Sequence, residues 1–267
     1  MSLARILICA GSDSGGGAGI QADIKTVTAL GGYAMTAITA LTAQDTLGVH
    51  GVMPVPPDFV RRQMRVVLAD FGADAVKTGM LGDAATIAAV AETLAELAPE
   101  VPLVLDPVMV AKGGASLLAL DALDALKTLL IPRAALLTPN LPEAEALLGR
   151  RIADVAAMQT AAEDLHGLGA GAVLVKGGHL DGDTLCDVLV GPDGIVIFEG
   201  ERIWTRHTHG TGCTLASAIA TRLGQGMELP HAVASARAYL MQAIRTAPGL
   251  GHGHGPLNHG HPLQHRG

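Results

Sequence analysis

The chain is poor in aromatic side chains and in charge of either sign. Its 267 residues include only three Phe, two Tyr and one Trp, and Lys plus Arg number 18 against 25 Asp plus Glu. With neither a basic block nor an aromatic platform, we expect no binding to nucleic acid or to an anionic membrane. No run of 18 or more apolar residues occurs, so we expect no segment that spans a membrane.

Cysteine is also scarce, and its distribution excludes the usual cysteine-based frameworks. Cys9, Cys186 and Cys213 are odd in number, lie far apart and form no C-x-x-C pair. Neither a disulfide-stabilised secreted domain nor a structural zinc site is therefore expected. The apolar stretch at the N-terminus is too short for a signal peptide and is more typical of a first buried strand. These features favour a cytoplasmic location.

Two common nucleotide-binding motifs are missing. The first glycine-rich stretch, GSDSGGGAG, lacks the G-x-G-x-x-G spacing of dinucleotide-binding folds, and no acidic residue stands at a strand end about 20 residues later. The chain also lacks G-x-x-x-x-G-K-[ST], the phosphate-binding loop of P-loop enzymes. A dehydrogenase and a P-loop NTPase are thus excluded. The glycines instead indicate close approach of the backbone to a small ligand.

What the chain does contain is an alternation of strand-like and helix-like segments. The expected strands cover residues 4–10, 33–41, 74–78, 101–106, 134–138 and 171–176. The expected helices cover residues 19–30, 57–70, 83–97, 121–130, 142–149, 154–168 and 230–246, with one more from residue 211. Continuous apolar strands between helices predict an α/β fold with a mostly parallel central sheet and helices on both faces.

One stretch breaks this alternation. Residues 184–206 are typical of a β-hairpin with a Pro-Asp-Gly turn. Because no repeat, long linker or shift in composition occurs, we expect a single domain over residues 1–248. Residues 249–267 form a tail that holds five of the 11 histidines among glycines and prolines. We expect an irregular terminus there, with metal binding as the alternative.

Polar clusters follow the predicted strands, which places them at one edge of a parallel sheet. Asp106, at the end of an apolar strand, is costly to bury unless it is paired, solvated or bound to a cation. Asn140 and Glu143 have the spacing of a helix capping box, and the alternative is that Glu143 joins Asp106 in binding Mg²⁺. Lys176, which leaves a buried strand, suits a phosphate group.

A further cluster, HTHGTGC, precedes an alanine-rich helical segment. Gly210 and Gly212 are poor helix formers, so the helix is expected to begin among them, with unpaired backbone N–H groups at its mouth. Such a mouth is a site for an anion, although a loop-to-helix junction with a small buried Cys213 is the alternative. Backbone donors, a lysine and two carboxylates for Mg²⁺ are together what phosphoryl transfer requires.

Seven stretches of the chain resemble, in order, the hydroxymethylpyrimidine/phosphomethylpyrimidine kinases of thiamine biosynthesis, a branch of the ribokinase superfamily close to the pyridoxal kinases. They read AGSDSGGGAGIQADIKT, TALTAQDT, KTGML, DPVMVAKGG, TPNLPEAEALLG, KGGH and THGTGCTLASAIA. The resemblance runs from about residue 5 to about residue 262 and includes the tail. It implies a three-layer α/β/α sandwich of the ribokinase type. Gly15 and Gly114 depart from it, since serines are expected there.

The resemblance also implies a role for each residue that matches its motifs. Those implied to contact the pyrimidine are Gln44, Asp23, Gly11, Ala18 and Met80. Those implied to serve ATP are Lys176, Asn140 and Thr211, and those implied to serve Mg²⁺ are Asp106 and Glu143. Those implied to form the anion hole are Gly210, Thr211, Gly212 and Cys213, with Lys176 as a further catalytic residue. For Asp23, a place on the polar face of its helix is the alternative.

Cys213 stands where most of the superfamily carries an aspartate that acts as the base. A helix N-terminus lowers the pKa of a thiol, whereas a bound phosphate beside it raises that pKa. Our hypothesis is that Cys213 assists as a base and that the anion hole contributes more. On that hypothesis Cys213→Ala lowers kcat by roughly 10²-fold.

The reaction that the resemblance implies has two steps at one site. ATP phosphorylates 4-amino-5-hydroxymethyl-2-methylpyrimidine to the monophosphate and then to the pyrophosphate. The alternative on the same fold is a pyridoxal/pyridoxine kinase. A non-catalytic pyrimidine-binding protein is the alternative from another class, and the retained Asp106, Glu143 and Lys176 argue against it. The resemblance further implies a homodimer.

Overall fold

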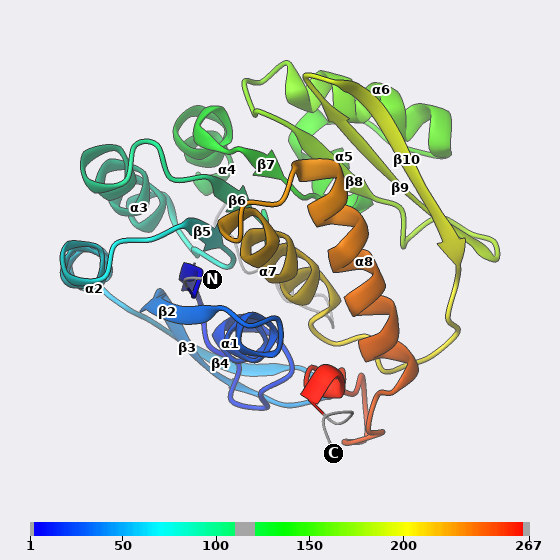
Figure 1. The fold of residues 1–267 in the computed structure, drawn as a ribbon, viewed down its shortest axis with the longest axis horizontal. Helices are drawn as coiled ribbons and strands as arrows, with labels where there is room; N and C mark the ends of the chain where they lie inside the picture. The colour runs from blue at the N-terminus through cyan, green and yellow to red at the C-terminus, as the bar shows by residue number, and fades with distance from the viewer. Residues whose placement is uncertain (1–2, 110–120, 264–267) are drawn as a thin grey trace.

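A twisted sheet of eight strands forms the centre of the computed structural model, which describes residues 3–109 and 121–263 (Figure 1). The strand order is β10-β9-β8-β7-β6-β5-β1-β2; the six strands from β8 to β2 are parallel, and β9 and β10 are antiparallel. The strands are β1 (Arg5–Ala10), β2 (Tyr33–Ile38), β5 (Ala75–Thr78), β6 (Leu103–Leu105), β7 (Leu136–Leu137), β8 (Val173–Lys176), β9 (Thr184–Gly191) and β10 (Gly194–Glu201).

Helices cover both faces of this sheet, as Figure 1 shows. They are α1 (Gly19–Ala29), α2 (Pro57–Asp70), α3 (Ala84–Leu97), α4 (Ala122–Ala125), α5 (Leu141–Leu148), α6 (Val155–His166), α7 (Thr211–Gly224) and α8 (Leu229–Arg245). The predicted three-layer α/β/α sandwich is confirmed. No helix within the described residues is long and apolar enough to cross a membrane.

The two helical layers enclose two separate apolar cores, and β1 contributes to both. Leu7 and Cys9 pack with the α2–α6 side, whereas Ile6 and Ile8 pack with α1, α7 and α8. Successive side chains of a strand point to opposite faces, so a strand covered on both faces must be apolar throughout. For this reason the parallel strands could be predicted from the sequence as continuous apolar runs.

The expected single strand over residues 33–41 is wrong in its second half. β2 ends at Ile38, and the chain then leaves the main sheet to form β3 (Ala40–Gln44), which pairs with β4 (Val49–Pro54) in a separate two-stranded sheet. Thr39 marks the departure, because its N–H donates to the Ala10 carbonyl and its hydroxyl to the Met80 carbonyl. No strand was predicted at β4, whose residues are mostly exposed and lack an alternating pattern.

Elsewhere the predicted elements are confirmed with small shifts. The hairpin of β9 and β10 is present, and the helix expected over residues 121–130 begins as α4 and continues as a π-helix over Leu126–Leu130. Gly114 lies outside the described residues. Part of the tail packs against the rest of the protein: Leu257 and His259 are buried, and the Tyr239 hydroxyl of α8 donates to the His259 carbonyl at 2.8 Å.

A buried ion pair fastens one helical layer to the sheet. Lys77 of β5 and Asp23 of α1 are both 0% exposed, and the Lys77 Nζ lies 3.0 and 2.9 Å from the two carboxylate oxygens of Asp23. The Ser217 hydroxyl of α7 donates to the same carboxylate at 2.6 Å. Burial alone lowers the pKa of Lys77, but Asp23, Cys213 and Asp106 outweigh it and raise the pKa, so Lys77 is charged.

This arrangement predicts an asymmetric response to mutation. Lys77→Met leaves the Asp23 carboxylate without its cation in the core, and we expect it to lower the free energy of unfolding by about 3–5 kcal/mol. The double variant Lys77→Met/Asp23→Leu removes both charges, and it should regain most of that loss in urea unfolding followed by circular dichroism. Equal losses in the single and double variants would contradict the pairing.

Candidate active site

A cavity of about 630 Å³ lies beyond the carboxyl ends of the parallel strands. The loops that follow β1, β5, β6, β7 and β8 all reach it, and the N-terminus of α7 closes one side. The sequence predicted a ligand site at this edge, since polar clusters follow one strand after another. All the site residues expected from the sequence line the cavity, except Asp23.

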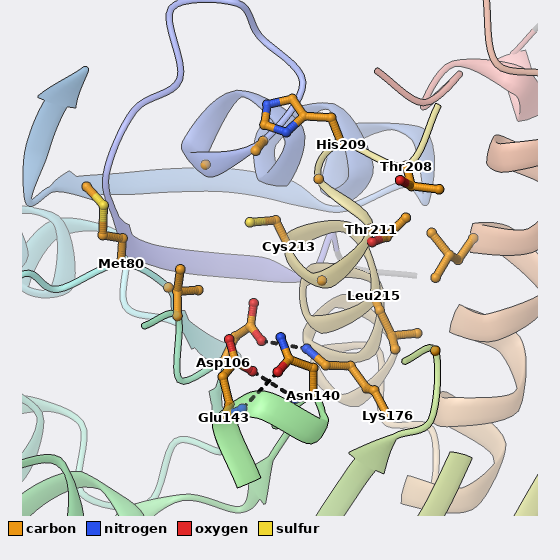
Figure 2. Close-up of a pocket in the computed structure, with 18 of the residues that line it drawn as sticks. Met80, Asp106, Asn140, Glu143, Lys176, Thr208, His209, Thr211, Cys213 and Leu215 are labelled. Carbon is orange, nitrogen blue, oxygen red and sulfur yellow. Dashed lines mark hydrogen bonds and ion pairs between the residues drawn. The ribbon is translucent and has the colours of Figure 1, made fainter. Parts of the chain in front are cut away.

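The mouth of α7 points into the middle of this cavity (Figure 2). The helix begins at Thr211, directly after Gly210, which has a left-handed backbone with φ of 83°. This positive φ disfavours any residue with a side chain. An added Cβ at Gly210 would in addition collide with the Gly17 carbonyl oxygen. The N–H groups of the first helical turn lack intrahelical partners, and no acidic side chain occupies that turn, so the mouth is suited to an anion.

Lys176 and Asp106 form an ion pair next to this mouth. The Lys176 Nζ lies 3.0 Å from Asp106 Oδ1, and the Thr138 hydroxyl is 3.2 Å from the same oxygen. A Cβ on Gly212 would stand 3.4 Å from Nζ and 3.6 Å from Asp106 Oδ2, in ordinary van der Waals contact, so glycine leaves more of this corner open to a ligand than a larger residue would. Burial lowers the pKa of Lys176, but Asp106 and Glu143 outweigh it, and the raised pKa keeps the ammonium charged.

Asn140 and Glu143 form the capping box that their spacing indicated. Asn140 Oδ1 accepts from the Glu143 N–H at 2.9 Å, and Glu143 Oε2 accepts from the Asn140 N–H at 2.8 Å, at the start of α5. Both residues also line the cavity, so capping the helix does not prevent them from contacting a ligand. Burial raises the pKa of Glu143 to about 7; Lys176 opposes this shift and Asp106 adds to it.

The donor set fits a hydrated magnesium ion better than a metal enclosed by protein. Within the described ranges, no three His, Cys, Asp or Glu side chains converge on a point that would hold a metal ion. Asp106 and Glu143 supply hard carboxylate oxygens on one wall, and Asp106 Oδ2 faces the α7 mouth. Two carboxylates, water and ligand phosphates are the usual surroundings of Mg²⁺ at a nucleotide site.

Cys213 does not have the lowered pKa that its helix position suggested. Its thiol is half-buried in the third position of α7. Burial raises its pKa to about 11; Asp23 and Asp106 act in the same direction, while Lys77 and the Gly19 N–H oppose them. The sequence showed the helix terminus, which lowers a thiol pKa, but not the two carboxylates that the fold brings near.

Asp23 is a correction to the expected substrate contacts. Its carboxylate is fully buried behind the cavity wall, where it faces Lys77 and Ser217. Lys77 has no motif of its own in the sequence, so its pairing with Asp23, 54 residues away, could not be read from spacing. Lys77 and Cys213 line the cavity, whereas Asp23 does not.

The remaining predicted acceptor residues gather on one side of Cys213, where Figure 2 places Met80. Gly11, Ala18, Met80 and Gln44 all line this lobe. The Gln44 amide nitrogen is 3.3 Å from His209 Nε2, and its oxygen is 3.3 Å from the Thr42 hydroxyl. Both contacts are long, so the Gln44 amide retains donor and acceptor capacity for a ligand.

The pair Asp13–His209, which was not predicted from the sequence, lies beside these residues. His209 Nε2 lies 2.8 Å from Asp13 Oδ2, and the Asp13 carboxylate also accepts from the N–H groups of Gly15, Gly17 and Ala18. Burial raises the pKa of Asp13, but His209 and the backbone donors outweigh it, so the net pKa is lowered and the group is ionised. Both residues stand inside quoted motifs, GSDSGG and THGTGC, which was the available signal.

The opposite lobe is more apolar and was not predicted. Leu240, Met241 and Ile244 of α8 line it together with Leu185 and Ile203. In Figure 2, Met80 and Lys176 lie on opposite sides of Cys213 at the α7 mouth, and the apolar residues of α8 line the same cavity. A cavity with two lobes that meet at an anion-binding helix terminus suits the transfer of a phosphoryl group between two bound molecules.

The fold and site therefore define a small-molecule kinase of the ribokinase type, and solved structures agree. The ADP complex of Bacillus subtilis pyridoxal kinase superimposes with a TM-score of 0.89 at 37% identity, covering 98% of this chain and 99% of that one. Phosphomethylpyrimidine kinase of Clostridium difficile superimposes with a TM-score of 0.80 at 41% identity, covering 91% of this chain and 100% of that one.

The chain belongs to the phosphomethylpyrimidine kinase family, whose sequence profile matches residues 13–258. Hydroxymethylpyrimidine/phosphomethylpyrimidine kinase of Bacillus subtilis is 46% identical, over 97% of this chain and 96% of that protein. The thiamine biosynthesis bifunctional protein ThiED of Geobacter sulfurreducens is 54% identical over 254 residues, which are 95% of this chain and 52% of that protein. The chain thus spans about half the length of the bifunctional relative. The family resemblance stated from the motifs is confirmed.

Gly210 provides a direct test of the helix mouth. Gly210→Ala should lower kcat by about 10²-fold or more, because the collision with Gly17 displaces the donors of the first turn. Gly226→Ala is the matched control: Gly226 has φ of 82° but no atom within 4 Å of an added Cβ, so it shares the backbone strain without the collision. We expect the control to lose about 1 kcal/mol of stability and little activity. Similar kcat values for the two variants would count against the anion hole.

The raised pKa of Cys213 predicts slow alkylation at neutral pH. With a pKa of about 11, about one thiol in ten thousand is ionised at pH 7, and that fraction grows tenfold per pH unit until the pKa is reached. The rate constant for iodoacetamide should therefore still be rising at pH 10 in the ligand-free enzyme. Cys213→Ser supplies the background from the buried Cys9 and Cys186. A plateau below pH 8 would show a lowered pKa instead.

Proposed function

We propose that this protein uses ATP to phosphorylate 4-amino-5-hydroxymethyl-2-methylpyrimidine to its monophosphate and then to its pyrophosphate, in thiamine biosynthesis. The observation that carries the proposal is the α7 mouth, which opens into a cavity that is also lined by Gln44 and by the Lys176–Asp106 pair. Membership of the phosphomethylpyrimidine kinase family supports the choice of acceptor.

In this proposal the acceptor lies in the Gln44 lobe. The Gln44 amide pairs with the aminopyrimidine edge, since it both donates and accepts hydrogen bonds. Gly11 and Ala18 allow the ring to approach the backbone, and Met80 packs against it. This placement directs the hydroxymethyl group toward Cys213 and the first turn of α7.

ATP occupies the opposite lobe, with its terminal phosphate at the α7 mouth. Lys176 and the N–H groups from Gly210 to Cys213 contact the phosphoryl oxygens, and Asn140 and Thr211 contact the nucleotide. Asp106 and Glu143 would hold Mg²⁺, which when bound offsets the negative charge of the phosphates. The charged donors are fixed before the reaction, so they stabilise the developing charge without rearrangement.

The first transfer forms one bond and breaks one. The hydroxymethyl oxygen bonds to the terminal phosphorus, the bond from that phosphorus to the bridging oxygen of ADP breaks, and the hydroxyl proton is released. With its raised pKa, Cys213 is chiefly a neutral thiol near the attacking oxygen. We therefore assign most of the rate to the anion hole and to Lys176, and keep the roughly 10²-fold loss for Cys213→Ala as the expected value for a proton-accepting role. A loss under about threefold would exclude that role.

The second transfer has an anionic acceptor, the monophosphate. Its attacking oxygen must approach a second phosphate, so the site needs positive charge and N–H donors close to the transfer point. The charged Lys176 and the α7 mouth supply both, next to the point where the first transfer takes place. A single site therefore suits both steps.

A pyridoxal or pyridoxine kinase is the second candidate. The pyridoxal kinase of Staphylococcus aureus, solved with AMP-PCP and pyridoxal, superimposes with a TM-score of 0.89 at 34% identity. Both substrates carry a hydroxymethyl group on a nitrogen-containing ring, so the same transfer machinery serves either. The identity to the pyrimidine kinases is higher, at 46% for the Bacillus subtilis enzyme, which favours the pyrimidine.

The deciding experiment is steady-state ADP release with Mg-ATP and three acceptors: the aminopyrimidine alcohol, its monophosphate and pyridoxine. We expect turnover of both pyrimidines, with pyridoxine at least about tenfold poorer in kcat/KM. A preference for pyridoxine, or an inert monophosphate, would leave the fold and the chemistry in place but refute the proposed substrate.

Two further proposals concern the state of the protein in solution and in the cell. A homodimer is supported by large apolar side chains exposed on the β3–β4 sheet, Leu41, Leu47, Val52 and Met53. A monomeric mass at micromolar concentration in analytical ultracentrifugation would contradict it. A cytoplasmic location is supported by three free cysteines, and fractionation of cells tests it.

A further inference from the structure

The glycine- and histidine-rich tail grips the turn that follows Gln44. The Thr46 hydroxyl accepts from the N–H groups of His252 and Gly253, each at 3.1 Å, and the Thr46 carbonyl accepts from the His254 N–H at 2.8 Å. Figure 1 shows the C-terminal segment beside α1 and the β3–β4 sheet. One half-buried threonine thus receives three backbone donors from a segment more than 200 residues away.

The glycines of the tail are required by this close approach. An added Cβ at Gly251 would collide with the Thr46 side chain, and one at Gly253 would collide with the Thr46 carbonyl oxygen. Gly251 also has φ of 81°, which disfavours any side chain. Further along, an added Cβ at Gly255 would collide with His207. The alternating glycines therefore reflect a surface that fits against the turn and against the segment before α7.

The same tail is joined to the phosphoryl-transfer loop. The His209 N–H donates to the Gly255 carbonyl at 3.2 Å, and His209 and Pro256 form a parallel β-bridge. The His209 ring in turn contacts Asp13 at 2.8 Å and the Gln44 amide at 3.3 Å. His209 directly precedes Gly210, so one residue connects the tail, the acceptor lobe and the α7 mouth.

The far end of the tail is anchored in the core. The Thr214 hydroxyl of α7 and His259 Nε2 are 2.9 Å apart, and the Asn258 N–H donates to the Ala243 carbonyl of α8. Burial lowers the pKa of His259 to about 4, so this contact is one of a neutral imidazole. The contacts of Asn258 and His259 therefore anchor the preceding residues 251–256, which contact the exposed β3–β4 turn.

We infer that residues 251–256, the tail clasp, position Gln44 opposite the α7 mouth and thereby help to set the affinity for the acceptor. The β3–β4 sheet stands apart from the main sheet, and the Gln44 backbone is held by the Ser14 hydroxyl, which accepts from its N–H and donates to its carbonyl, each at 2.8 Å. The clasp holds the turn beyond Gln44, through Thr46 on one side and His209 on the other. Thr46 and the tail glycines act through Gln44 and are positioning residues; none of them lines the cavity.

The inference rests on the proposed function in one respect, namely that the acceptor binds at Gln44. It is distinct from a purely structural role for the tail, because the clasp contacts the turn that follows Gln44 and none of its residues lines the cavity, so we expect the acceptor KM to change and the ATP KM to stay nearly constant. A role in stability alone would lower thermal stability and the fraction of active enzyme, while the acceptor KM and the ATP KM would both stay unchanged.

The test compares two pairs of matched variants. Gly253→Ala introduces the collision with Thr46, whereas Gly260→Ala places a methyl group in the same tail with its nearest neighbour at 3.8 Å. Thr46→Val removes the hydroxyl acceptor at nearly constant volume, whereas Thr46→Ser keeps it. We expect Gly253→Ala and Thr46→Val to raise the acceptor KM by at least about fivefold while the ATP KM stays within about twofold, and the two controls to behave as wild type.

Hydrogen exchange of the turn provides the second readout. Amides of residues 45–48 and 251–255 should exchange faster in Gly253→Ala and Thr46→Val than in the controls. Unchanged acceptor KM in both variants, or a parallel rise in both KM values, overturns the inference. If Gly253→Ala does not fold, Thr46→Val decides alone. Wild-type enzyme is assayed first with the pyrimidine and with pyridoxine, so a wrong substrate is recognised separately and the clasp is then tested with the acceptor that turns over.

Discussion

The close approach of Gly210 to the Gly17 carbonyl is the constraint on which the site depends. It brings the loop after β1 against the start of α7, two segments separated by almost the whole chain. The Asp13–His209 contact at 2.8 Å fastens the same junction from the side. Because the loop after β1 and the first turn of α7 both line the cavity at this junction, we expect a displacement there to alter the proposed acceptor binding and phosphoryl transfer together.

Charge in the site is arranged as pairs that are placed before any ligand binds. Lys77 is balanced by Asp23, and Lys176 by Asp106. The pairs let two lysines remain charged at the edge of an apolar core, where a lone ammonium would lose its proton. Burial raises the pKa of the Cys213 thiol and keeps it protonated; Asp23 and Asp106 of the two pairs add to this effect, and Lys77 opposes it.

Much of the architecture could be predicted from the sequence because buried parallel strands must be apolar on both faces. The capping box at Asn140 could also be predicted, since it depends on residues three positions apart. The β3–β4 sheet was not, because its strands are exposed and carry no alternating pattern. The loops at one sheet edge were predicted correctly as a group, although the apolar lobe formed by α8 was not, because helix residues that line a cavity have the same spacing as residues in a core.

The sequence by itself determined the family, the order of the helices and of the main-sheet strands, and which loops supply the polar groups of the cavity. Those features follow from local patterns and from motifs whose residues are neighbours in the chain. Only the tertiary structure decided that Asp23 faces Lys77 instead of the ligand, that Cys213 has a raised pKa, and that the tail reaches Thr46. These depend on distances between residues that are far apart in sequence, and on burial, neither of which a local pattern contains.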